Sequence, residues 1–167
     1  MRCFLAAIAA VGLVSVEVNA AEQQVPVAES EQARFAVGGG IWEALDNMDI
    51  YYAQSAYEFA EFEPLWGIRP TVLAMLSEDG EYYFAGGWLK EFELAERWDW
   101  GSGNVVGYHS DNDFLGHHLE FYSRIFVNYG SKSDGFWRLE FGHISNASIG
   151  DRNPGTETLT LTYNWRL

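Results

Sequence analysis

The sequence has few basic residues, a single cysteine, and no long apolar run beyond its first twenty residues. It carries 10 Lys and Arg against 24 Asp and Glu, which gives a net charge of -14. We exclude nucleic acid as a partner, because binding to phosphates needs clustered Lys and Arg. One cysteine excludes a disulfide framework. The lack of apolar runs excludes membrane-spanning helices in the body of the chain.

The N-terminus has the pattern of a secretory signal peptide over residues 1–20. Arg2 supplies a positive charge, residues 4–16 form a short apolar stretch, and small residues precede a cleavage position after Ala20. Cleavage removes Cys3, so we expect the mature chain to have no thiol for a zinc site or for nucleophilic catalysis. An N-terminal membrane anchor is the alternative interpretation.

The sequence is instead rich in apolar and aromatic residues, which make up 48% and 16% of it. This content excludes intrinsic disorder despite the charge. We expect residues 21–31 to form a polar periplasmic tail and residues 32–167 to form one domain. Aromatic-rich segments in that domain alternate with short breaks of Gly, Asp, Asn or Ser, which is typical of an all-β protein. We expect eight strands, at about 32–44, 50–62, 65–77, 80–91, 94–109, 117–129, 134–146 and 156–167.

Most of these segments alternate between apolar and polar side chains with a period of two; the fourth and fifth cannot be phased. A soluble sandwich and a transmembrane barrel both produce this alternation, but in a barrel the apolar face meets lipid and the polar face lines the lumen. Strand lengths that fit a tilted crossing, aromatic residues near strand ends and charges of both signs on the polar faces favour the barrel. We therefore expect an eight-stranded antiparallel transmembrane β-barrel in the outer membrane. The charges expected in its lumen are Arg69, Glu120, Arg124, Arg138 and Glu140.

The barrel topology also predicts which breaks face the cell exterior. With both termini in the periplasm, the odd-numbered strands run outward. The breaks after them, at about 45–49, 77–80, 110–116 and 147–155, then lie outside.

Three polar residues interrupt the apolar face near the exterior end of the last two strands. His143 and Ser145 continue the apolar face of the seventh strand, and Glu157 continues that of the eighth. Residues i and i+2 of a strand are roughly 7 Å apart on one face, so an imidazole can reach the serine, and a carboxylate on the paired strand can orient the imidazole. This arrangement predicts the nucleophile, base and acid of a serine hydrolase. The alternative is that the three simply lie in the headgroup zone, where polar side chains cost little.

A metal site has less support in the sequence. Asp111 and Asp113 could hold a divalent cation in an exterior break, but a short acidic run in a loop is usually solvated. His117 and His118 are adjacent and so project to opposite faces of a strand. We therefore expect no metal.

The residues around the three polar positions resemble the lipid A 3-O-deacylase (PagL) family and its acyloxyacyl-hydrolase-like relatives. The resemblance rests on HISNA at 143–147, followed by NPGTE at 153–157 and the alternating end strand. The two motifs together are specific, whereas HxS alone occurs in many proteins. Weaker similarity extends over 38–42, 69–70, 115–116 and 120–121.

The resemblance implies an outer-membrane esterase that removes the 3-O-linked hydroxyacyl chain of lipid A in lipopolysaccharide, without a cofactor. It implies Ser145 as the nucleophile, His143 as the general base and Glu157 as the residue that orients His143. Asn146 and Asn153 match positions of the oxyanion-binding part of the family site. The partners would be lipid A and outer-membrane lipids, and the site would face the outer leaflet.

Other functions stay open on the sequence alone. They are a non-catalytic small outer-membrane barrel, and a phospholipase or acyltransferase of the same membrane. The sequence also leaves open whether two copies form a homodimer. In an esterase, we expect the acyl chain to lie along Leu139, Phe141, Leu159 and Leu161.

Overall fold

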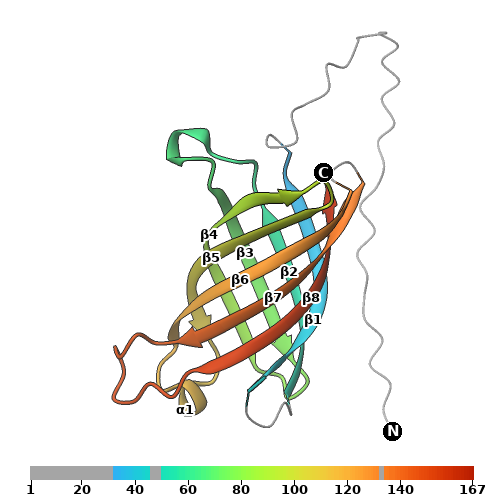
Figure 1. Ribbon diagram of the computed structural model, residues 1–167. Coiled ribbons are helices and arrows are strands. Elements are labelled where there is room, and N and C mark those ends of the chain that lie inside the picture. The colour runs from blue at the N-terminus through green and yellow to red at the C-terminus, as the bar shows by residue number, and fades with distance from the viewer. Residues whose placement is uncertain (1–31, 46–49, 132–133) are drawn as a thin grey trace, which may run out of the picture.

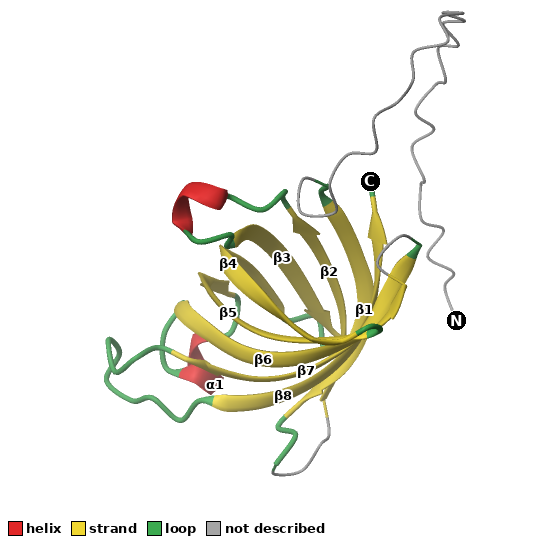
Figure 2. Cartoon of the chain, turned by 45° about the horizontal axis from the view of Figure 1, so that its top comes forward, coloured by secondary structure: helices red, strands yellow, loops and turns green. Residues whose placement is uncertain are grey.

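The computed structural model describes residues 32–45, 50–131 and 134–167; the expected signal peptide and tail lie outside the described residues. Antiparallel strands form one closed barrel in which each strand pairs with its neighbours in the sequence and β1 closes on β8 (Figures 1 and 2). The predicted fold class is therefore confirmed. The strands are β1 (Arg34–Trp42), β2 (Ile50–Glu58), β3 (Arg69–Ser77), β4 (Tyr82–Ala95), β5 (Trp98–His109), β6 (Leu119–Ser131), β7 (Gly135–Ser145) and β8 (Thr156–Arg166).

The two ends of the barrel differ. β1 begins and β8 finishes at one end, which we call the terminal end; Arg34 pairs there with Arg166. Helix α1 (Asn112–Leu115) and the connection between β7 and β8 lie at the opposite end, which we call the α1 end (Figure 1). The described parts of the breaks after the odd-numbered strands share the α1 end, as the predicted topology requires. Residues 46–49 of the first break lie outside the described residues. No helix in the described part of the chain is long and apolar enough to cross a bilayer.

The connection between β2 and β3 differs from the prediction. β2 ends at Glu58 rather than near 62, and β3 begins at Arg69 rather than near 65. The 3-10 helix η2 (Glu63–Leu65) takes the predicted break and the first residue of the expected third strand. Pro64 lies in the first turn of η2 and has no backbone N–H to give to a strand ladder. Trp66, which follows, takes a left-handed conformation with φ 58° and ends the helix.

The turn between β4 and β5 also lies later than predicted, since β4 continues to Ala95 and β5 begins at Trp98. The ladder has an irregularity between Glu93 and Ala95. Phe92 and Trp100 are cross-strand partners here, and their rings stack with centroids 4.8 Å apart. This stacking favours pairing beyond the expected break.

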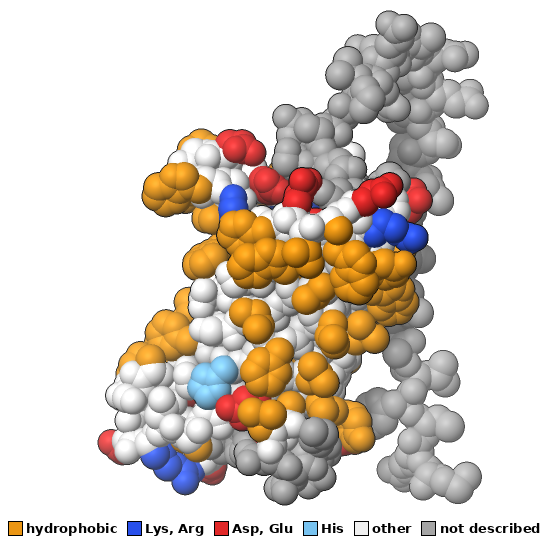
Figure 3. Space-filling model, viewed as in Figure 1, with side chains coloured by type: hydrophobic (Ala, Val, Ile, Leu, Met, Phe, Trp, Pro, Cys, Tyr) orange, Lys and Arg blue, Asp and Glu red, His pale blue; other side chains and the backbone are white. Residues whose placement is uncertain are grey.

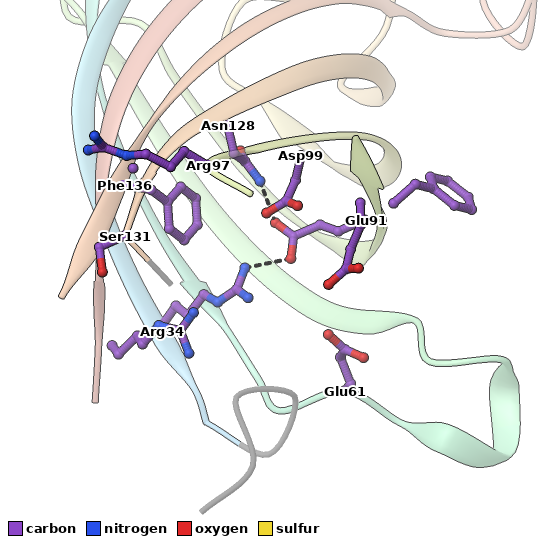
Figure 4. A pocket seen from close by; sticks show the side chains of 12 residues that line it. Arg34, Glu61, Glu91, Arg97, Asp99, Asn128, Ser131 and Phe136 are labelled. Atoms are coloured by element: carbon purple, nitrogen blue, oxygen red, sulfur yellow. Dashed lines mark hydrogen bonds and ion pairs between the residues drawn. The ribbon is translucent and has the colours of Figure 1, made fainter. Parts of the chain in front are cut away.

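Ion pairs fill the lumen near the terminal end. Arg138 pairs with Glu58 and donates to Glu91 Oε1 at 2.9 Å, and Arg34 donates to Glu91 Oε2 at 2.6 Å. Asn128 donates to Glu91 Oε1 at 2.7 Å and accepts from Arg138 Nε at 2.9 Å. Figure 4 shows Arg34 and Asn128 meeting at Glu91, beside a cavity of about 280 Å³. Of the charges expected in the lumen, Arg138 pairs with Glu58, Arg124 pairs with Glu140 at 3.0 Å, and Arg69 pairs with Glu61 at 3.1 Å. The prediction fails for Glu120, whose buried carboxylate has no hydrogen-bond partner among the described residues.

Near the α1 end, large aromatic and aliphatic side chains fill the lumen, and the side chains of His109 and Glu120 are buried there as well. Trp42 stacks on Tyr52 with ring centroids 5.2 Å apart, and both are buried. This end is therefore a packed core behind the last residues of β7. The large side chains of the cluster are Trp42, Tyr52, Leu73, Met75, Tyr83, Leu115, Tyr122 and Ile144.

Large hydrophobic side chains cover the outer wall of the barrel, as Figure 3 shows for one face. At the α1 end, the Tyr82 ring contacts the rings of Phe84 and Tyr108. A wall this apolar, with aromatic zones toward both ends, is the face that a membrane barrel turns to lipid. The ring pairs near the terminal end are Phe35–Trp165, Phe92–Trp100, Trp98–Tyr129 and Trp137–Tyr163.

The charged cluster predicts a stability effect. Replacing Arg138 with Met leaves the buried Glu58 without its closest positive partner, so the free energy of unfolding should fall by about 3–5 kcal/mol. Urea unfolding of the refolded barrel, followed by Trp fluorescence, measures the change. Arg97→Met is the control, because Arg97 is exposed and lies over the Tyr129 ring. A loss below about 1 kcal/mol for Arg138→Met would contradict the role of the cluster.

Candidate functional site

A histidine and a carboxylate are in contact on the outer wall near the α1 end. His143 of β7 and Glu157 of β8 are directly opposed in the ladder, and His143 Nδ1 lies 3.2 Å from Glu157 Oε1. In the neutral tautomer in which Nδ1 donates to this carboxylate, Nε2 carries the lone pair and can act as a base. The two side chains are 48% and 26% exposed. The prediction that they are neighbours on the outer face is confirmed.

Ser145 is the last residue of β7 and shares the outer face with His143. Positions two residues apart on a strand are separated by roughly 7 Å. Its cross-strand partner is the outward-facing Phe121 of β6. Among the described residues, no hydrogen bond is made by the Ser145 hydroxyl, and such contacts are often long until a substrate binds.

Gly155 brings the connection between β7 and β8 against the imidazole of His143. A Cβ at Gly155 would lie 2.7 Å from His143 Cε1 and 3.0 Å from Nε2. Its φ of +68° is also one that side chains rarely adopt. The glycine therefore lets the loop pass directly over the side of the ring that carries Nε2. Sequence analysis gave Gly155 no role, although it lies inside the quoted NPGTE motif.

Asn146 is the internal anchor of the loop that follows Ser145. Its Nδ2 donates to the carbonyl oxygens of Leu115 at 2.9 Å and Arg152 at 2.8 Å. Its Oδ1 accepts from Ser148 N–H at 2.9 Å, and its side chain is fully buried. Both amide hydrogens are therefore committed to folding the loop onto α1.

Asn153 differs from Asn146 in that its amide oxygen, and not its amide nitrogen, is bonded within the loop. Its Oδ1 accepts the backbone N–H of Asn146 at 3.0 Å, and the residue is exposed. In the described part of the chain, no acceptor lies within hydrogen-bond distance of Asn153 Nδ2. This fixes the Asn153 amide beside the residue that follows Ser145, with its two N–H groups available to a ligand.

Tyr122 of β6 supports the site from inside the barrel. A side chain at Gly142 would overlap the Tyr122 ring, so this glycine lets the ring lie against β7. Tyr122 Oη donates to Glu140 Oε1 at 2.7 Å and lies 3.0 Å from Thr158 Oγ1. The tyrosine thus links β7 to β8 next to His143. Sequence analysis missed it; the available signal was a glycine inside an otherwise alternating strand.

The acids considered for a metal lie in and beside α1, and the Asp113 carbonyl accepts a hydrogen bond from Arg152 of the connection between β7 and β8. Asp111 accepts the backbone N–H of Asp113 at 2.8 Å. Burial, a hydrogen bond that the protonated Glu81 carboxyl donates to Asp111, and the negative charge of Asp111 raise the pKa of Glu81 to about 7. No group of three or more His, Cys, Asp or Glu side chains suited to a metal ion is found in 32–45, 50–131 and 134–167.

Comparison with solved structures shows the same fold in two other proteins. A crystal structure described as the outer membrane enzyme PagL is 18% identical, with a TM-score of 0.58 over 80% of this chain and 99% of that one. A barrel from work on the de novo design of transmembrane beta-barrels is 9% identical, with a TM-score of 0.61 over 82% of this chain and 96% of that one. A search of curated proteins found no match.

A family model gives the identification. The model described as lipid A 3-O-deacylase (PagL) matches residues 82–166, just over half of the 167 residues. The match runs from β4 to β8 and includes His143, Ser145 and Glu157. With the barrel fold and the His143–Glu157 contact, the conclusion is that this chain belongs to the lipid A 3-O-deacylase (PagL) family.

Proposed function

We propose that the protein is an outer-membrane esterase that hydrolyses the 3-O-linked hydroxyacyl chain of lipid A. Ser145 is the nucleophile, His143 the general base, and Glu157 the carboxylate that orients His143. The observation that carries the proposal is the His143–Glu157 contact at 3.2 Å, on the outer wall and two residues from Ser145. A lipid-facing site suits a substrate that stays in the membrane, because the ester reaches the serine without leaving the bilayer.

The reaction proceeds as in other serine hydrolases. His143 Nε2 takes the proton of the Ser145 hydroxyl as its oxygen attacks the ester carbonyl carbon, and Glu157 stabilises the imidazolium that forms. The tetrahedral intermediate collapses when the bond to the sugar oxygen breaks, and that oxygen receives the proton from Nε2. Water, activated by the same imidazole, then attacks the acyl-enzyme and releases the fatty acid and free Ser145.

Asn153 is the donor that we assign to the developing oxyanion. Its Nδ2 has no acceptor among the described residues, and its Oδ1 is held by Asn146 N–H at 3.0 Å. An amide that is already oriented can stabilise the oxyanion without reorganising. Both side-chain amide hydrogens of Asn146 are used inside the loop. Asn146 instead orients Asn153, because its backbone N–H donates to Asn153 Oδ1.

The proposal includes an orientation in the membrane. The α1 end faces the cell exterior and the terminal end faces the periplasm, after removal of residues 1–20. His143 then lies at the level of the outer leaflet, where lipid A resides. The apolar wall below it, including Phe141, is the surface for acyl chains.

The first functional prediction concerns Ser145. Refolded protein incubated with lipopolysaccharide should lower the mass of lipid A by one hydroxyacyl chain, measured by mass spectrometry. Ser145→Ala should slow the release at least about a thousandfold, because the nucleophile is lost. Ser55→Ala, at an outward-facing serine of β2, is the control and should match the wild type. Equal spectra for wild type and Ser145→Ala would refute the assigned nucleophile, and release from phospholipid alone would refute the substrate.

The two asparagines should respond differently to substitution. Asn153→Ala should lower kcat by about a hundred- to a thousandfold, since one oxyanion donor is lost. It should lower the unfolding free energy less than Asn146→Ala does, because only the hydrogen bond from Asn146 N–H is lost. Asn146→Ala should reduce stability by about 1–3 kcal/mol, because it removes buried hydrogen bonds. Steady-state kinetics and urea unfolding separate the two effects. An Asn153→Ala enzyme with wild-type kcat would refute its role.

A further inference from the structure

A row of polar side chains crosses the outer wall from the site. His143 is the cross-strand partner of Ser123 on β6, and Ser123 is the partner of Asn104 on β5. Together with Glu157, these residues lie on four consecutive strands at one register level. All face outward, and Asn104, Ser123 and His143 are exposed. The other outward residues of β5 and β6, apart from Ser102, are Trp98, Trp100, Val106, Tyr108, Leu119, Phe121, Ile125, Val127 and Tyr129.

The row lies in a groove that ends at the candidate base. The groove has a volume of about 390 Å³. The small side chains of Ser102 and Ser123 lie among bulkier neighbours, so they leave the wall hollow. In Figure 3, a pale blue side chain on this wall adjoins a red one, and white atoms extend from it toward the terminal end between orange side chains. The residues with side chains that line the groove are Ser102, Asn104, Ser123, Ile125, Phe141 and His143, with Arg124 beside them.

The polar pair in this groove keeps hydrogen-bonding capacity for a ligand. Ser123 Oγ donates to Asn104 Oδ1 at 2.7 Å. Within the described ranges, neither N–H of Asn104 Nδ2 has an acceptor, and Ser123 Oγ accepts no hydrogen bond. The pair therefore offers two donors and one acceptor on a part of the wall where, apart from Ser102, the neighbouring outward residues of β5 and β6 are aromatic or aliphatic. Exposing such groups to lipid is unfavourable unless something satisfies them.

The tilt of the strands indicates what covers the groove. β5, β6 and β7 cross the barrel obliquely, so a line from β7 through β6 to β5 rises from the α1 end toward the middle of the barrel (Figure 1). An acyl chain that runs along the bilayer normal from an ester at Ser145 therefore passes over Ser123 and Asn104. Ser123 is a diagonal neighbour of Ser145, at roughly 7–8 Å. With its ester at Ser145, an acyl chain can therefore place a substituent a few carbons from the ester carbonyl beside Ser123.

We propose that Ser123 and Asn104 bind an oxygen substituent, a hydroxyl or an acyloxy oxygen, on the acyl chain that the site removes. Asn104 Nδ2 donates to that oxygen, and Ser123 Oγ accepts from it when it is a hydroxyl. The pair thereby selects an oxygenated chain over a plain hydrocarbon chain of the same length. The inference rests on the proposed function, because it takes the lipid whose ester reaches Ser145 as the occupant.

A binding competition in the Ser145→Ala background tests the inference without turnover. The refolded variant is mixed with equal amounts of two synthetic lipid A molecules that differ only in a hydroxyl on the 3-O-linked chain, and native mass spectrometry measures the ratio of complexes. The parent should prefer the hydroxylated lipid by roughly three- to tenfold, as expected for one neutral hydrogen bond. Adding Asn104→Leu or Ser123→Ala should bring the ratio close to one.

The controls make each outcome decisive. An apolar residue at either position suits a lipid-facing wall, so these variants should fold. Ser55→Ala should keep the parent ratio.

Equal binding by the parent, or an unchanged ratio in Asn104→Leu, would overturn the inference. If Asn104→Leu breaks up a dimer and leaves the ratio unchanged, the pair belongs to an interface between copies, and the inference is overturned as well. A wild-type protein that fails to cleave lipid A refutes the proposed reaction, while this binding ratio still decides the inference.

Discussion

The closed ladder of backbone hydrogen bonds is the constraint on which the whole structure depends. Because β1 pairs with β8, the barrel has no free edge, and each strand residue must point either into the lumen or out from the wall. Most charges on the inner face pair with one another, as Arg138 does with Glu58, and apolar side chains on the outer face meet lipid. A polar side chain on the outer face is then an exception that calls for a chemical reason.

The same constraint explains why sequence alone could predict the fold and the candidate triad. Both depend on a period of two residues, which can be counted without coordinates. Counting along β7 and β8 placed His143, Ser145 and Glu157 on one face and at one end of neighbouring strands, and the structure brings His143 and Glu157 into contact. The roles of the three residues in a reaction stay proposals drawn from that geometry and the family.

Features that depend on loop folding or on register between strands could not be predicted in this way. Asn146 and Asn153 look equivalent in the sequence. In the structure, both amide hydrogens of Asn146 are used inside the loop, whereas only the amide oxygen of Asn153 is bonded there. Ser123 and Asn104 are nineteen residues apart, and only the register of β5 against β6 places them beside each other. Gly155 passes over the imidazole because of its positive φ, which a motif alone does not reveal.

The central claim is that a reactive serine lies on the lipid-facing wall, and covalent labelling tests it most directly. A long-chain alkyl fluorophosphonate, presented in mixed micelles with the refolded barrel, transfers its phosphonyl group to an activated serine with loss of fluoride. One adduct should form, on the peptide that contains Ser145, and it should be absent in His143→Ala. A folded barrel that gives no adduct, or an adduct on another serine that persists in His143→Ala, would contradict it.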